Sequence, residues 1–280
     1  MAEQRTIVIT GATDGLGKAL ASELAPAGGR LILHGRNEEK GQKLLEELAP
    51  RATGELEWRR ADLASLDEVR DLANSLLEED RIDVLVNNAG IGTTAEGAGE
   101  RGDGGREESA DGYELRFAVN YLAPFLLTRR LLPLIERSAP ARIVNVTSAG
   151  QAPIDFDDVM LERSYNGIQA YCQSKIALVM LTFDLAEELE GSGVTANCLH
   201  PGTYLPTNMV RRAGVDPVTP LEDGVEATMR LIASPELDGV NGHYFDGTSE
   251  SAPHPQAEDP EARRQLRELS AELTGIQATA

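Results

Sequence analysis

Two side chains in the second half of the chain have the spacing and chemistry of a proton-transfer pair. Tyr171 and Lys175 stand four positions apart in the run Y-C-Q-S-K, so a helix would place them on one face. A phenol has a pKa of about 10, and a nearby ammonium favours the phenolate. The tyrosine could then donate or accept a proton near neutral pH. The spacing alone is common, so its meaning depends on what surrounds it.

A glycine-rich turn near the N-terminus predicts a binding site for a dinucleotide. The run T-G-A-T-D-G-L-G begins at Thr10, at the end of an apolar run. Between a strand and a helix, glycines let the backbone turn sharply and approach a pyrophosphate closely. The N-terminus of the following helix stabilises the phosphate charge. The residues of this turn that we expect at the cofactor are Gly11, Thr13, Asp14, Gly15, Leu16 and Gly17.

The end of the second predicted strand favours NADP over NAD. An NAD enzyme usually carries an acid about 20 residues past the glycines, where it binds the ribose 2′-hydroxyl. Here the sequence is H-G-R-N, and no acid appears before Glu38. The guanidinium of Arg36 could pair with a 2′-phosphate. Asp14 argues in the other direction because it lies in the turn near the same phosphate. We therefore expect NADP, with NAD as the alternative.

Apolar runs alternate with amphipathic helical patterns along the chain, which predicts parallel strands buried on both faces. Repeated β-α units form a doubly wound sheet, with right-handed crossovers. We predict an α/β fold with a mostly parallel, seven-stranded Rossmann-type sheet in a single domain. The predicted strands are Thr6–Thr10, Arg30–His34, Leu56–Arg60, Ile82–Val86, Arg142–Val146, Val194–Leu199 and His243–Phe245. The predicted helices are Leu16–Leu24, Glu38–Leu48, Leu66–Leu77, Tyr113–Ser138, Ile168–Glu190, Val225–Ile232 and Glu261–Leu273.

Some segments depart from this alternation. Gly92–Gly112 is rich in glycine and charge, and we expect a mobile excursion. Ala149–Gly167 is a long link before the helix of Tyr171, and Thr203–Pro220 is expected to form a flexible lid. We assign residues 1–247 to a dinucleotide-binding and catalytic domain. Residues 248–280 would be a polar C-terminal extension with a short helix.

Composition excludes several classes of partner. The 280 residues include 46 acidic and 26 basic side chains, for a formal net charge of −20. Such a surface repels nucleic-acid backbones and anionic lipids, so we expect neither a nucleic-acid nor a membrane partner. Cys172 and Cys198 cannot form a disulfide framework and lack metal-ligand spacing, so we expect no metal. With no signal-peptide pattern at the start and no apolar run of bilayer length, we expect a cytoplasmic protein.

In chain order, these motifs resemble the classical short-chain dehydrogenase/reductase family, from about Thr6 to Phe245. The glycine turn matches the family pattern T-G-x-x-x-G-x-G. The C-terminal extension and the long link before Tyr171 look most like the retinol-dehydrogenase-like branch. The other matching motifs are Asp62-Leu63, Asn87-Asn88-Ala89-Gly90, Asn120, Ser148, Tyr171 with Lys175, and Pro201-Gly202.

The resemblance implies an enzyme that transfers a hydride between a nicotinamide cofactor and a ketone, an aldehyde or a secondary alcohol. Tyr171 would be the general acid for reduction and the base for oxidation. Ser148 would hydrogen-bond the substrate oxygen and stabilise developing negative charge. Lys175 would lower the pKa of Tyr171 and hold the nicotinamide ribose, and Asn120 would position a water that relays protons. The further cofactor contacts that it implies are Asp62, Leu63, Asn88, Ala89, Gly90, Pro201 and Gly202, with Tyr171 and Lys175.

Two details of the pattern leave roles open. We expect Asn87 to be structural and leave it out of the site. The family usually has a threonine four residues after the glycine of the P-G pair, where this chain has Pro206. Thr203 or Thr207 could take its place.

Two other functions compete with this one. A dinucleotide-binding sensor or scaffold without turnover is the alternative, although it would not need the whole set of catalytic residues. A sugar-nucleotide epimerase or dehydratase would need a larger C-terminal domain than the residues after Gly247 can form. Apolar residues in Thr203–Pro220 favour a small-molecule substrate with a hydrophobic body. Family members are often dimers or tetramers, so a homo-oligomer stays open.

Overall fold

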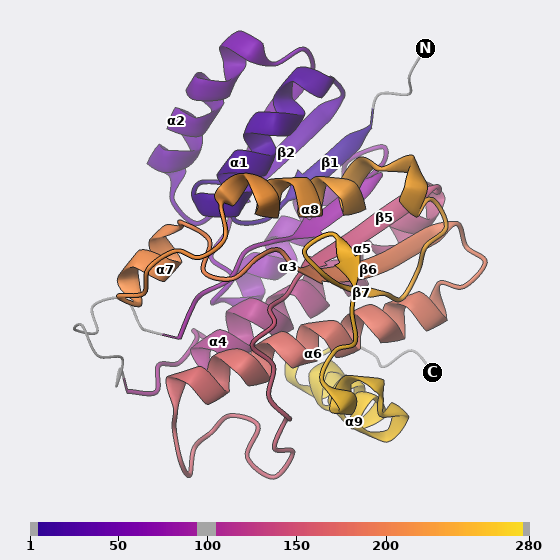
Figure 1. Cartoon of the computed structure of the whole chain (residues 1–280). Coiled ribbons are helices and arrows are strands. Elements are labelled where there is room, and N and C mark those ends of the chain that lie inside the picture. Colours follow the sequence, from indigo (N-terminus) through magenta and orange to yellow (C-terminus); the bar gives the residue numbers. More distant parts are fainter. Residues whose placement is uncertain (1–4, 94–104, 277–280) are drawn as a thin grey trace.

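A central sheet covered by helices on both faces forms the core of the molecule (Figure 1). The computed structural model describes residues 5–93 and 105–276. Within them the strand order is β3-β2-β1-β4-β5-β6-β7-β8, and every neighbouring pair is parallel except β7 with β8. The strands are β1 (Thr6–Ile9), β2 (Arg30–Gly35), β3 (Glu55–Arg60), β4 (Val84–Asn87), β5 (Ala141–Val146), β6 (Val194–His200), β7 (Tyr244–Asp246) and β8 (Ser249–Glu250).

The α/β class and the mostly parallel, doubly wound sheet are confirmed, but the predicted number of strands is wrong. The described residues form eight strands rather than seven. The chain turns back at Gly247, where φ is 58°, and β8 pairs antiparallel with β7. Both residues of β8 are exposed. A strand of two exposed residues has no apolar alternation, so the hydrophobic pattern could not reveal it.

Two apolar clusters separate the sheet from its helices. Along β1, Val8 packs with the cluster that contains α3, α5 and α6, whereas Ile7 and Ile9 pack with α1, α2 and α8. Because both faces of the strand are buried, its sequence is continuously apolar. The helices are α1 (Gly15–Leu24), α2 (Glu38–Leu48), α3 (Leu66–Leu76), α4 (Leu115–Phe117), α5 (Ala123–Arg137), α6 (Gly167–Glu188), α7 (Asn208–Arg212), α8 (Leu221–Ala233) and α9 (Pro260–Thr274).

The long helix predicted over Tyr113–Ser138 is divided in the structure. A π-helical turn, Ala118–Leu122, lies between α4 and α5. In it the N–H of Ala123 donates to the carbonyl of Ala118, five residues back. Such a turn accommodates one extra residue without ending the helix, and it is frequent at functional sites. Asn120 lies in this turn and is fully buried.

The C-terminal helix α9 completes the apolar layer beneath α5 and α6 (Figure 1, yellow). Leu266 is buried in the cluster that includes α5 and α6. The hydroxyl groups of Tyr121 and Ser270 lie 2.7 Å apart, and Arg267 donates to Asp184 of α6 at 2.9 Å. The charged helix predicted from the sequence therefore packs one face against the core.

The carboxyl ends of the parallel strands meet at one edge of the sheet. The strand order reverses between β1 and β4, the neighbours at which β2 and β5 lie on opposite sides. In open α/β sheets, ligands bind at this edge beside such a reversal. None of the helices among the described residues is long and apolar enough to span a bilayer.

Candidate active site

Helix α6 presents Tyr171 and Lys175 at the carboxyl edge of the sheet. The Nζ atom of Lys175 lies 5.7 Å from the centre of the Tyr171 ring and donates to the carbonyl of Val146 at 3.1 Å. Ser148 follows β5 and lies near the tyrosine. A methyl group on Gly150 would lie 3.4 Å from Ser148 Oγ and 3.7 Å from a ring carbon of Tyr171.

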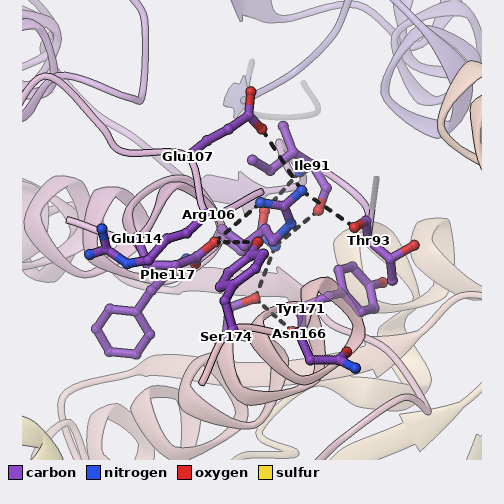
Figure 2. A network of polar contacts seen from close by, with 12 residues as sticks. Ile91, Thr93, Arg106, Glu107, Glu114, Phe117, Asn166, Tyr171 and Ser174 are labelled. Atoms are coloured by element: carbon purple, nitrogen blue, oxygen red, sulfur yellow. Dashed lines mark hydrogen bonds and ion pairs between the residues drawn. The ribbon is translucent and has the colours of Figure 1, made fainter. Parts of the chain in front are cut away.

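Asn120 enters the same site from the π-helical turn. A methyl group on Gly90 would lie 3.1 Å from Asn120 Oδ1 and 3.4 Å from Lys175 Nζ. The Asn120 amide also donates to Ser174 Oγ at 2.9 Å, and Ser174 donates to the carbonyl of Tyr171 at 2.7 Å. Figure 2 shows Ser174 beside Tyr171 on the same helix. The structure thus brings together Ser148, Asn120, Tyr171 and Lys175.

Burial changes the acidity of both members of the helix pair. Burial raises the pKa of Tyr171, and a hydrogen bond with Ser148 acts in the opposite direction. Burial also lowers the pKa of Lys175 to about 8. The protein alone therefore does not favour the phenolate. The positive charge of an oxidised nicotinamide ring would favour it when the cofactor is bound.

The glycine turn forms a cradle that fits a pyrophosphate. Gly11 and Gly15 have φ values of 69° and 50°, which side chains disfavour. A methyl group on Gly17 would lie 2.2 Å from the carbonyl oxygen of Gly11, so this contact excludes any side chain. Asp14, the N-cap of α1, makes no side-chain hydrogen bond to the helix. The first N–H groups of α1 therefore have no side-chain cap and could bind an anion.

Asn88 supports this turn from the neighbouring strand. Its side-chain amide donates to the carbonyls of Thr10 at 2.8 Å and Gly11 at 3.2 Å. The Thr10 hydroxyl in turn accepts from the backbone N–H groups of Asn88 and Ala89. Sequence reasoning placed Asn88 at the cofactor, and the structure shows its amide engaged with the turn. Thr10 was left out of the predicted site, although it is the first residue of the matched T-G-x-x-x-G-x-G pattern.

The predicted adenine side of the site lies where β2 and β3 end. Arg36 is exposed immediately after β2. Glu38, the first acid after that strand, accepts hydrogen bonds from Trp58 at 2.9 Å and from Gln42 at 2.8 Å. Asp62 accepts from the N–H of Ala64 at 3.0 Å. The side chains of Leu16 and Leu63 are buried among other apolar residues, so only their backbone could meet a cofactor.

The predicted lid is a folded segment that includes α7. Thr203 and Thr219 pair through two hydrogen bonds, of 2.9 and 3.0 Å, just after the Pro201-Gly202 pair. Thr207 is the N-cap of α7. A methyl group on Gly15 would lie 2.7 Å from its Cγ2. Thr207, rather than Thr203, therefore contacts the glycine turn, and Thr203 lies 3.3 Å from a ring nitrogen of His200.

Asn87 is part of a buried polar chain that holds strands and helices together. Its amide donates to Thr128 at 3.0 Å and to Asn145 at 2.8 Å, and Asn145 donates to Thr182. These contacts agree with its expected structural role. Tyr244, which sequence reasoning missed, donates to the carbonyl of Ser148 at 3.3 Å.

Comparisons with known proteins agree with this architecture. Residues 5–217 match the family model for the short chain dehydrogenases. Human retinol dehydrogenase 13 is 39% identical, over 98% of this chain and 86% of that protein. A solved structure of an uncharacterised protein from Mycobacterium paratuberculosis has a TM-score of 0.78 and 30% identity, covering 99% of this chain and 96% of that one. A short chain dehydrogenase from Shigella flexneri, solved with NADP, has a TM-score of 0.69 and 26% identity, covering 88% and 97%.

Proposed function

The chain belongs to the short chain dehydrogenase family and is an NAD(P)-dependent oxidoreductase; we propose that it interconverts a carbonyl and an alcohol, with Tyr171 as general acid and base and NADP as cofactor. The observation that carries this proposal is the convergence of Tyr171, Lys175, Ser148 and Asn120 at the carboxyl edge of the sheet. In the reductive direction, the product would be a secondary or primary alcohol.

The chain's own residues would divide the work of reduction. Ser148 donates a hydrogen bond to the substrate oxygen and stabilises the negative charge that develops there. Tyr171 donates its phenolic proton to that oxygen, and it accepts the proton back in oxidation. Asn120 donates to Ser174, and Ser174 donates to the Tyr171 carbonyl, so this pair would fix the position of Tyr171 on its helix. Lys175 would present its ammonium on the same helix face. Bound nicotinamide supplies or accepts the hydride.

NADP is the proposed cofactor because of the charges at the end of β2. Arg36 offers a guanidinium for a 2′-phosphate. Glu38, which could otherwise accept from a 2′-hydroxyl, already accepts from Trp58 and Gln42. The related Shigella protein was solved with NADP, and a related Sphingobium yanoikuyae dehydrogenase with NADPH.

Exposed apolar side chains support a substrate with a hydrophobic body. Ile168 is 64% exposed and stands three residues before Tyr171, on the same helix face. Tyr204 is 50% exposed, and the N–H of Val218, itself 67% exposed, donates to the Tyr204 carbonyl. Of the four large apolar side chains exposed in the described residues, these three lie on the catalytic helix and the lid. Contiguous exposed apolar patches often mark ligand-binding grooves, and these side chains would contribute to such a patch at the substrate side of the site.

The proposal is tested by turnover with a panel of hydrophobic ketones and aldehydes, with NADPH and NADH in parallel, in wild type and Tyr171→Phe. The substitution removes the transferable proton and keeps the ring, so kcat should fall about 10² to 10⁴-fold while the Kd of NADPH stays within about twofold. Cys172→Ala, at the next position of the helix, is the matched control and should keep wild-type kcat. A Tyr171→Phe protein with kcat within about threefold of wild type would sink the assignment of Tyr171.

A further inference from the structure

A buried arginine that the proposed chemistry does not use lies one helical turn before Asn120. Arg116 belongs to α4, and its side chain is 1% exposed. Arg116 and Asn120 stand four positions apart, so their side chains extend from the same side of the helix. Both side chains reach the segment Ile91–Thr93, which follows the N-N-A-G motif at the end of β4.

The two side chains hold three consecutive residues of that segment. Asn120 accepts from the N–H of Ile91 at 2.8 Å and donates to its carbonyl at 3.1 Å. Arg116 Nε donates to the carbonyl of Gly92 at 3.1 Å, and Nη2 donates to that of Thr93 at 3.3 Å. Asn120 therefore holds Ile91, and Arg116 holds the next two residues, Gly92 and Thr93.

The surroundings of Arg116 fix the guanidinium in one orientation. Its Nη1 atom donates at 3.2 Å to Glu114, which is equally buried, and its Nη2 atom lies 3.9 Å from Glu107. The ring of Tyr165 lies 5.9 Å away, and the Tyr165 hydroxyl donates to the same Glu114 oxygen. Because the guanidinium is planar and these partners fix it, its other N–H groups already point at the carbonyls of Gly92 and Thr93.

The held segment is in tight contact on two sides. A methyl group on Gly92 would lie 2.8 Å from Met209 Cγ of α7, in the lid. A methyl group on Gly167, the first residue of α6, would lie 2.4 Å from the Thr93 carbonyl oxygen. The contact at Gly167 is with backbone and leaves no room for a side chain, whereas a methyl group on Gly92 would require the Met209 side chain to shift. A small shift of the segment would therefore change how the lid and the start of the catalytic helix meet.

We propose that Arg116 is a positioning residue for substrate: it fixes Gly92 and Thr93 as the surface against which Met209 and the start of α6 close. The proposal rests on the proposed function of this site. It predicts that Arg116 affects the binding and orientation of substrate. The glycine turn, which hydrogen-bonds with Asn88 and His34, should keep its affinity for cofactor.

Arg116→Lys tests this with the charge retained. One ammonium cannot reproduce the fork that joins Glu114 to two carbonyls. The KM for a ketone substrate should rise about tenfold, with kcat changed by less than about threefold and the Kd of NADPH by less than about twofold. Arg106→Lys is the matched control, since the Arg106 side chain donates to the carbonyl of Met160 at 2.8 Å and to Glu108, and makes no hydrogen bond with Glu114, Gly92 or Thr93. Its KM should stay at the wild-type value.

A second pair of variants perturbs the same contact from the lid side. Gly92→Ala should raise KM because its methyl group meets Met209, and Gly92→Ala/Met209→Ala should restore it. These variants keep Arg116 and its partners, so they test the proposal even if Arg116→Lys does not fold. A wild-type KM in Gly92→Ala, or equal losses in Arg116→Lys and Arg106→Lys, would overturn it.

Hydrogen exchange separates failure of this proposal from failure of the proposed function. If wild type reduces no carbonyl, the proposed function is wrong. The effect of Arg116 on the segment Ile91–Thr93 can still be measured. Arg116→Lys should then speed exchange at Ile91–Thr93 and at α7 relative to Arg106→Lys, with β4 unchanged. Unchanged exchange at both segments would show that Arg116 positions neither.

Discussion

At the scale of single residues, the site contains a buried lysine whose hydrogen-bond partner is a backbone carbonyl. Lys175 is 4% exposed, and Nζ donates to a backbone carbonyl. Burial lowers its pKa to about 8, so its ammonium is less costly to neutralise than a surface lysine. Tyr171 is held nearby with a raised pKa. Perturbed pKa values of this kind cluster at functional sites.

Arg36 is the residue on which the cofactor preference should depend. Arg36→Asp should weaken NADPH binding and favour NADH, because the carboxylate repels a 2′-phosphate and accepts from a 2′-hydroxyl. Hydrogen bonds to charged groups contribute about 1.5–3 kcal/mol, so the ratio of the two Kd values should shift tenfold or more. Fluorescence titration with both cofactors measures this.

The control for that titration is Lys43→Asp, which makes the same charge change on α2. It should leave the ratio of the NADPH and NADH Kd values near that of wild type. An unchanged ratio in Arg36→Asp would mean that Arg36 does not contact the phosphate.

The residues that could be predicted from the sequence are those with fixed spacing to a recognisable motif. Tyr171 and Lys175 are four positions apart, and Ser148 follows a strand, so each could be placed on an element before the fold was known. Arg116 could not be assigned, because its partners Gly92 and Tyr165 are far from it in the sequence and are brought to it only by the fold. Without that contact, it is indistinguishable from a solvated charge on a helix.

At the scale of elements, the hydrophobic runs predicted the parallel strands. They did not predict the π-helical turn or the short helix α7. The extra residue of the π-helical turn leaves the apolar pattern around Asn120 almost unchanged, so a single helix was predicted. Helix α7 has five residues and none of them is buried, which gives no periodic signal. Of the predicted mobile excursion Gly92–Gly112, residues 94–104 lie outside the described residues. In the described part, the N–H of Ala110 donates to the carbonyl of Ala64 at 2.8 Å, and Asp111 accepts from the N–H of Leu66 at 2.9 Å.

The lid is the element that should respond to cofactor. Thr207 contacts Gly15 of the glycine turn, so bound NADPH should give Thr203–Pro220 a surface to pack on. Hydrogen exchange should slow in this segment when NADPH is added. Helix α9, which is packed against α6, should keep its exchange rates and serves as the internal reference. A lid whose exchange rates do not change with saturating NADPH would contradict a cofactor-ordered segment.

At the scale of the whole molecule, one sheet divides the apolar interior into two clusters. His34 lies at the carboxyl end of β2 and is 2% exposed. Its Nε2 atom donates to the carbonyl of Ala61 at 3.1 Å. Burial lowers the pKa of His34 to about 4, from an ordinary value of 6.5. The folded chain therefore holds this imidazole neutral at a pH where the unfolded chain binds a proton.

Acid stability should consequently depend on His34. Because the folded pKa is depressed, the unfolded chain takes up a proton first as the pH falls below 6.5, and stability decreases until about pH 4. The loss from this group is about 3 kcal/mol. In His34→Gln, which can still donate to Ala61, the free energy of unfolding should fall less over this range, as measured by urea titration at pH 7, 5.5 and 4.5. The carboxylates are common to both proteins, so their contribution cancels in the difference. Parallel pH profiles for the two proteins would show that His34 is protonated without unfolding.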